Sequence, residues 1–242
     1  MFITFSAAVL YVGRFRIKSF VNRYELEDIK QFEGTKDDQK WAKKLMNGGY
    51  LIHVRHAERD KWLDVAAYDS LETSVENKNK VFPRRAENEY FANAVCLNSK
   101  GKIQAKMMGE HLKNIKFPIG YVLTSPSCRA RQTAELAFGG YDSEDIQLVH
   151  SGPYFDNREK RIEILKKIYS SAPIKKGKNT IITSHNSVIN QFIFNDPDVF
   201  GLEKPKLEEG GFYIISRNEN GLKMEHEFHS FTSFIRQFYT RQ

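Results

Sequence analysis

Apolar residues occur along the chain in two patterns. Short apolar runs at 50–54, 120–124 and 178–183 have the length of buried strands, and each is followed by polar residues. Apolar residues at helical spacing predict helices over 103–115, 129–138, 158–169 and 187–194, with a short strand at 146–149. Two alternating stretches, 211–216 and 222–228, predict a hairpin. The alternation predicts an α/β fold, a three-layer α/β/α sandwich with a mainly parallel sheet and an antiparallel edge.

The segments before and after the first predicted strand, 1–47 and 60–94, indicate how the chain is organised into domains. A helix over 37–46 is expected to end at Gly48-Gly49, where glycine suits a helix C-terminus. We therefore expect residues 1–47 to form an apolar and helical approach segment, followed by one main domain over 48–242. The stretch 60–94 is long and charged, which is typical of a functional insertion. It leaves the first strand's end, so we expect it to overhang any site built there.

Polar groups follow the three strongest strands and suggest one shared site. They are Arg55-His56, the run from Ser125 to Arg129, and Ser184-His185-Asn186. Ligands of open α/β sheets bind outside the carboxyl ends of the strands, so these groups are expected to meet.

The residue types suit phosphoryl transfer. Arg55 and Arg129 can each present a fork of donors to phosphate oxygens and stay charged at any working pH. A neutral His56 can attack phosphorus, and nearby guanidinium groups favour that neutral form by lowering the pKa of His56. A protonated His185 would donate a further hydrogen bond to the phosphate, as would backbone amides at the start of the helix that carries Arg129.

The motifs resemble those of the histidine phosphatase superfamily, the phosphoglycerate-mutase-like fold, and in particular its small bacterial members. The resemblance spans about 48–194 and rests on Arg55-His56-Ala57-Glu58, Leu97-Asn98-Ser99-Lys100-Gly101 with Gln104-Ala105, the run from Ser125 to Ala134, and Thr183-Ser184-His185-Asn186. It implies that Arg55, Arg129 and His185 bind phosphate and that His56 is the phosphorylated nucleophile. Ala57 stands where glycine is commoner, and Ser184 where glycine is frequent.

The residue that protonates the leaving group is left open by the sequence. Asp156 falls in a polar stretch where the superfamily often places its general acid, and Glu58 and Glu159 compete with it.

Charge and cysteine content narrow the partners. The net charge of +7 favours an anionic partner, but the basic residues are interleaved with acids, so we expect a small phosphate ester and no specific nucleic acid. We expect no cofactor and no metal, because the acids do not cluster at ligand spacing and the expected pocket is cationic. The two cysteines, Cys96 and Cys128, could form one bridge, and Cys128 is more typical of a small packing residue than of a nucleophile.

The first residues leave localisation open. Residues 2–13 are apolar but shorter than the roughly 20 residues of a membrane span. A short anchor and a packed helix or strand both fit, so the protein is either cytoplasmic or exported and membrane-associated. The sequence does not specify an oligomeric state.

These features together predict a metal-independent phosphomonoesterase that works through a phosphohistidine at His56. A phosphotransferase or mutase on the same site is one alternative. A catalytically silent module that binds phosphate esters is the other.

Overall fold

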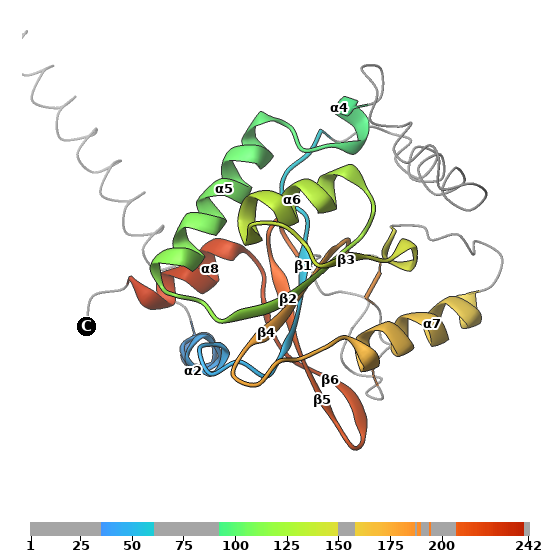
Figure 1. Ribbon diagram of the computed structural model, residues 1–242. Helices are drawn as coiled ribbons and strands as arrows, with labels where there is room; N and C mark the ends of the chain where they lie inside the picture. Colours follow the sequence, from blue (N-terminus) through green and yellow to red (C-terminus); the bar gives the residue numbers. More distant parts are fainter. Residues whose placement is uncertain are drawn as a thin grey trace, which may run out of the picture.

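A computed structural model describes residues 35–60, 92–149, 158–186, 188–189, 194 and 207–239 (Figure 1). Within these residues, six strands form one sheet in the order β3-β2-β4-β1-β5-β6. Their bounds are β1 Leu51–Arg55, β2 Ile119–Thr124, β3 Ser143–Glu144, β4 Asn179–Ser184, β5 Phe212–Asn218 and β6 Gly221–Phe228. Strands β3, β2, β4 and β1 pair in parallel, whereas β5 and β6 pair antiparallel. The predicted mainly parallel sheet with an antiparallel edge is confirmed.

Helices cover both faces of this sheet and complete the predicted three layers (Figure 1). Helices α2 (Lys36–Leu45), α5 (Ser99–Asn114), α6 (Cys128–Phe138) and α8 (Phe231–Ile235) share one hydrophobic core with one face. Helix α7 (Arg158–Ser171) packs on the other face through Leu165 and Tyr169. Short helices α4 (Ala92–Val95), η2 (Ile146–Leu148) and η3 (Arg236–Phe238) complete the described elements.

Two details of the predicted pattern are wrong. The expected strand at 146–149 is the single 3-10 turn η2, and the neighbouring strand is β3, in which only two residues pair with β2. Of the apolar residues that predict a helix over 103–115, Ile103 and Met107 are exposed on α5, while Ala105, Met108 and Leu112 are buried. The spacing of 105, 108 and 112 is the helical one, so the two extra apolar residues broadened the predicted face. Most of the helix predicted over 187–194 lies outside the described residues.

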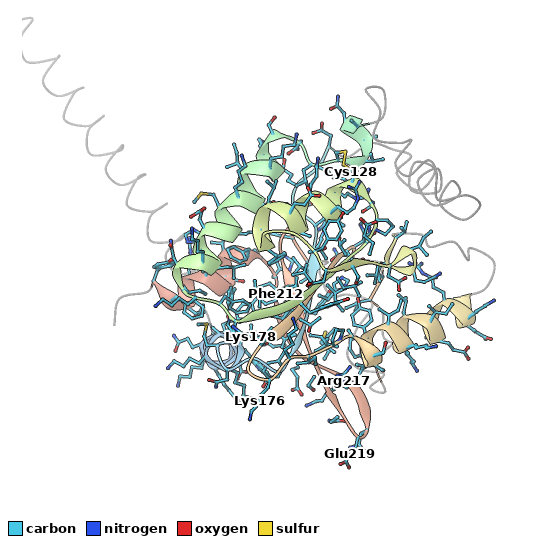
Figure 2. All side chains as sticks on the ribbon, in the orientation of Figure 1. Cys128, Lys176, Lys178, Phe212, Arg217 and Glu219 are labelled. Atoms are coloured by element: carbon cyan, nitrogen blue, oxygen red, sulfur yellow. A yellow bond between two sulfur atoms is a disulfide. The ribbon has the colours of Figure 1, made fainter. Side chains whose placement is uncertain are left out.

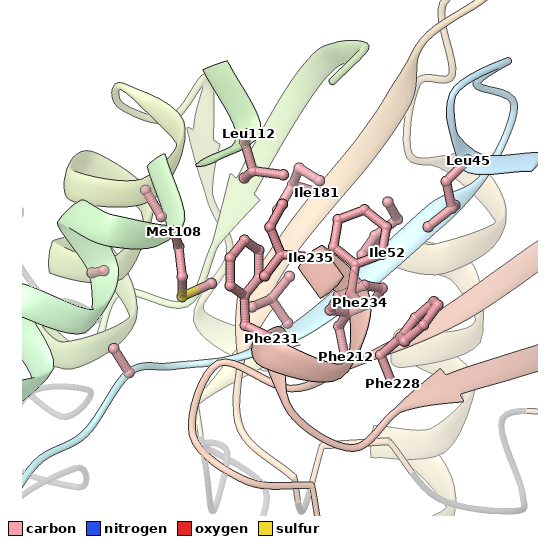
Figure 3. Close-up of a cluster of buried hydrophobic side chains, with 14 of the residues drawn as sticks. Leu45, Ile52, Met108, Leu112, Ile181, Phe212, Phe228, Phe231, Phe234 and Ile235 are labelled. Atoms are coloured by element: carbon pink, nitrogen blue, oxygen red, sulfur yellow. The ribbon is translucent and has the colours of Figure 1, made fainter. Parts of the chain in front are cut away.

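The aromatic residues near the C-terminus close the core. Phe228, Phe231 and Phe234 are buried against Phe212 of β5, with ring centroids 5.1–6.0 Å apart in the contacts among them (Figure 3). Aromatic rings bury a large apolar area each, so this cluster fixes α8 against the sheet.

The segment before β1 packs on the same core. Helix α2 begins at a capping box in which Thr35 and Asp38 exchange hydrogen bonds with each other's backbone. Trp41 and Leu45 of α2 are buried with the α5 face. The domain boundary at residue 48 and the insertion 60–94 stay predictions, and the apolar residues 2–13 lie outside the described residues. Among the described helices none is long and apolar enough to cross a membrane.

The two cysteines form a disulfide between Cys96, which follows α4, and Cys128, the first residue of α6 (Figure 2). Cys128 is buried in a small apolar cluster, and the bridge that the sequence left open is present. Both sulfur-bearing residues are buried beside Ala94 and Val95. The bridge ties α4 to the start of the helix that carries Arg129.

We expect removal of this bridge to destabilise the protein. The bridged residues are 32 positions apart. Closing a loop of this length lowers the entropy of the unfolded chain, which stabilises the folded state by about 3–4 kcal/mol. The double variant C96A/C128A should therefore lose free energy of unfolding on that order, measured by urea denaturation. Dithiothreitol should lower the stability of the wild type by a similar amount and leave the double variant unchanged. Equal stability of the wild type with and without reductant would contradict this expectation.

Candidate active site

The predicted site residues follow three neighbouring strands. Strand β4 lies between β1 and β2, and Arg55 pairs with Ser184 while Thr124 pairs with Thr183. The ladder continues beyond the strands, because the His56 amide donates to the Ser184 carbonyl and the Ser125 amide to the Thr183 carbonyl. The carboxyl ends of β1, β4 and β2 therefore meet at one edge of the sheet. This arrangement brings His56, His185 and the Ser125–Arg129 turn together.

His56 is held in one tautomer by its own loop. Its Nδ1 lies 2.7 Å from the Ala57 carbonyl oxygen, which can only accept, so Nδ1 carries the proton. In a neutral ring the other nitrogen, Nε2, then has a free lone pair. His56 is buried, with 5% of its surface exposed. The local backbone thus leaves the Nε2 lone pair of His56 available.

The surroundings of His56 also keep the ring neutral. Burial is the main cause that lowers the pKa of His56 well below its ordinary value, and the Arg129 guanidinium is the second. The Ala57 hydrogen bond raises this pKa, and Arg55 and Arg59 lower it further. Sequence reasoning overlooked Arg59, although it directly follows the motif Arg55-His56-Ala57-Glu58.

His185 faces His56 and the turn before α6. The two imidazole rings lie 5.2 Å apart between centroids. The Nε2 of His185 lies 3.3 Å from Ser125 Oγ and 3.2 Å from Ser127 Oγ. The two serines therefore fix the direction of the His185 ring, a role the sequence did not assign to them individually.

Two buried side chains, His53 and Tyr169 of α7, hold the backbone of His185 through a chain of hydrogen bonds. His53 Nε2 donates to the His185 carbonyl at 3.1 Å, so His53 Nδ1 accepts from the Tyr169 hydroxyl at 2.6 Å. Burial lowers the pKa of His53 to about 4, against the opposing effect of the His185 bond. His53 is thus an interior histidine with both ring nitrogens hydrogen-bonded.

Arg129 and Arg131 are both buried near the start of α6. Arg129 Nη1 lies 3.5 Å from the Val95 carbonyl, and its own carbonyl accepts from Thr133 Oγ1 at 2.7 Å. Arg131 is 3% exposed, and its Nε donates to the Pro126 carbonyl at 2.9 Å. Arg131 therefore braces the turn that carries Arg129.

The remaining motif residues hold the loop after β1. Thr133 accepts from the Ala57 amide, Gln104 from the Glu58 amide and Gln132 from the Leu97 amide, each at 2.9 Å. Asn98 caps α5 by accepting from the Gly101 amide at 2.8 Å. Gly101 must be glycine because a Cβ there would lie 1.9 Å from the Glu58 carbonyl oxygen. The motif residues thus hold the loop of His56 in place, in addition to supplying the residues predicted to react.

The three candidates for the general acid, Asp156, Glu58 and Glu159, lie in different parts of the chain. Asp156 lies outside the described residues. Glu58 is half-buried, and its Oε1 accepts from Asn98 Nδ2 at 3.2 Å. Glu159 is exposed in the first turn of α7.

The charged groups around the site suit an anion. Arg55 donates from Nη2 to Glu209 Oε1 at 2.5 Å and from Nη1 to the Leu207 carbonyl, two partners that sequence reasoning missed. In the described part of the chain, no three His, Cys, Asp or Glu residues are grouped so that they could hold a metal ion.

The buried His53 predicts a pH dependence of stability. The unfolded chain binds a proton on this histidine near its ordinary pKa of 6.5, whereas the folded protein does so only near 4. Since the unfolded state binds more protons between these values, the free energy of unfolding should fall as the pH drops from 6.5 to 4, by about 3 kcal/mol from His53. The variant H53Q should show a correspondingly shallower fall in urea denaturation across this range. A pH dependence identical to that of the wild type would contradict the assignment.

Comparison with known proteins gives one match to a family model. Residues 51–150 match the model of the histidine phosphatase superfamily (branch 1). No curated protein matches the chain.

Several solved structures are similar at low identity. The protein histidine phosphatase SixA, solved with tungstate, is 17% identical over 74% of this chain and 96% of its own, with a TM-score of 0.44. A phosphoserine phosphatase from Entamoeba histolytica, solved with 3-phosphoglyceric acid, is 15% identical over 74% and 95%, with a TM-score of 0.42. Mycobacterial hydrolase 1 is 11% identical over 76% and 99%, with a TM-score of 0.45. Values this low support no assignment of substrate or reaction.

The family match covers β1, α5, β2 and α6, the elements that carry Arg55, His56 and Arg129. Residues 51–150 are therefore similar to the histidine phosphatase superfamily (branch 1) in the part of the chain that carries these elements.

Proposed function

We propose that the protein hydrolyses a small anionic phosphate monoester through a phosphohistidine at His56, without a metal ion. The observation that carries the proposal is the hydrogen bond from His56 Nδ1 to the Ala57 carbonyl at 2.7 Å. It leaves the Nε2 lone pair available for attack, and burial and Arg129 keep the ring neutral by lowering the pKa of His56. A site that only binds phosphate esters has no need of a prepared nucleophile.

In the proposed first step, the Nε2 lone pair forms a bond to phosphorus while the bond from phosphorus to the ester oxygen breaks. The departing oxygen takes a proton from the general acid and leaves as the alcohol. In the second step, water attacks the phosphohistidine and loses a proton to the same group, while the bond from nitrogen to phosphorus breaks. Inorganic phosphate leaves, and His56 is again neutral with its proton on Nδ1.

The charge that moves through these steps is balanced by cations at the strand ends. Arg129 is a permanent charge close enough to lower the pKa of His56, and Arg55 and Arg59 act in the same direction. The first amides of the eleven-residue helix α6 follow the turn that contacts His185, and a helix N-terminus attracts phosphate oxygens. Stabilising charge on a transferring phosphoryl group is the main task of such a site.

For the general acid we keep Asp156 as the proposal, with Glu58 as its competitor. The Asn98 bond places the Glu58 carboxylate next to the start of α5, while its amide is held by Gln104. D156N and E58Q, assayed side by side against substrates with good and poor leaving groups, would separate them. Only loss of the true acid should slow a poor leaving group selectively.

The variant H56A should lose nearly all turnover. Removing a nucleophile typically lowers kcat by about 10³-fold or more, here measured on p-nitrophenyl phosphate. H111A is the matched control, because His111 is a half-buried histidine on α5 that contacts Tyr239. Quenching with alkaline detergent should also trap a base-stable, acid-labile phosphoenzyme in H111A and none in H56A. Unchanged turnover in H56A would contradict the mechanism.

Turnover should survive removal of metal ions. The proposed steps use only imidazole, guanidinium, carboxyl and backbone groups, so dialysis against EDTA should leave kcat/KM within about twofold. Loss of activity that zinc or magnesium restores would contradict metal independence. Transfer of the trapped phosphoryl group to an added alcohol in preference to water would instead identify a phosphotransferase or mutase.

A further inference from the structure

Arg55 is held by a carboxylate that no sequence motif predicts. Its Nη2 donates to Glu209 Oε1 at 2.5 Å, and its Nη1 donates to the Leu207 carbonyl. The side chains of Arg55 and Glu209 are only 21% and 20% exposed, so this pair is more shielded than a typical surface ion pair. The two bonds fix the plane of the guanidinium and leave its other N–H groups available.

The turn that carries Glu209 is built directly on the end of β1. The Gly210 amide donates to the Arg55 carbonyl at 3.0 Å, and the Arg55 amide donates to the Gly211 carbonyl at 2.9 Å. Gly210 has φ +82°, and a Cβ on Gly211 would lie 2.1 Å from the His229 carbonyl oxygen. Both positions therefore favour glycine, which lets this backbone approach Arg55 closely.

A second clamp joins the same turn to the loop of His56. Gln104 donates from Nε2 to the Glu209 carbonyl at 2.7 Å, while its Oε1 accepts from the Glu58 amide. The backbone of Glu209 is thus fixed relative to both Arg55 and the loop after His56. A carboxylate held this firmly can orient its partner with little loss of conformational freedom on substrate binding.

We propose that Glu209 is the positioning residue of Arg55: as a hydrogen-bond acceptor, it aims the guanidinium at the phosphoryl oxygens of the substrate. The inference rests on the proposed function, since it assigns Arg55 to that phosphate. Glu209 acts through Arg55 and transfers no proton. Its negative charge opposes the substrate's charge, so the benefit comes from orientation, and orientation of a reacting pair strongly affects rate.

The test compares two nearly isosteric variants, E209Q and E209M. Both remove the charge, but only glutamine keeps an oxygen that can accept from Arg55. We expect kcat/KM on p-nitrophenyl phosphate to fall about 10–100-fold in E209M and to stay within about fivefold of the wild type in E209Q. The pH profile should keep its shape in both variants, because no proton passes through Glu209.

The control uses the neighbouring residue. Glu208 is exposed, and its amide donates to the His229 carbonyl. E208Q and E208M make the same changes one residue away and should retain the wild-type kcat/KM. Thermal melts of all four variants show whether each is folded, and E209A replaces E209M if the latter is not.

Two outcomes would overturn the inference. Wild-type activity in E209M would show that the acceptor does not matter, and equal losses in E209Q and E209M would point to charge or proton transfer instead. Calorimetric titration with inorganic phosphate gives a readout that needs no turnover: E209Q should bind at least about tenfold more tightly than E209M. If the wild type lacks phosphatase activity, the proposed function fails, while this titration still decides whether Glu209 positions Arg55.

Discussion

The hydrogen bond from His56 Nδ1 to the Ala57 carbonyl is the interaction on which the rest of the site depends. It connects adjacent residues, so it is only as rigid as the loop that contains it. That loop is fixed from outside: Thr133 accepts from the Ala57 amide and Gln104 from the Glu58 amide. Helices α5 and α6 therefore support the tautomer of His56, and the packing of the core on this side of the sheet becomes a condition for the chemistry.

The electrostatics of the site must meet two requirements at once: a neutral imidazole at His56 and cationic groups around it. The proposed nucleophile must be neutral, and its surroundings must be cationic enough to bind phosphate. Burial of His56 and the neighbouring Arg129 meet both, since each lowers the pKa of His56 while Arg129 also supplies a permanent charge. His185 differs, because its Nε2 lies between the hydroxyls of Ser125 and Ser127. The two histidines thus have separate surroundings although their rings lie 5.2 Å apart.

Much of this arrangement could be predicted from the sequence because it depends on strand ends. Parallel strands end at a common edge, so Arg55-His56, Ser125–Arg129 and His185 had to lie near one another once the strands were recognised. The partners that could not be predicted are remote in sequence and lack a local signal. Glu209 is 154 residues from Arg55, and Tyr169 is 116 residues from His53. The short strand β3 was missed for another reason, because only two residues pair and no apolar period marks them.

Glu209 and Tyr169, the partners remote in sequence, belong to elements outside the family motifs. The site therefore has one part supported by motif residues and another supported by these remote residues. The loop of His56 is supported by α5 and α6, whose motif residues also carry Arg129. Arg55 depends instead on the turn before β5, and the backbone of His185 depends on α7 through His53. Gln104 is the side chain that contacts both the loop of His56 and the turn of Glu209. The geometry of His56 and that of Arg55 are therefore coupled through α5, so a change in the packing of that helix would disturb both together.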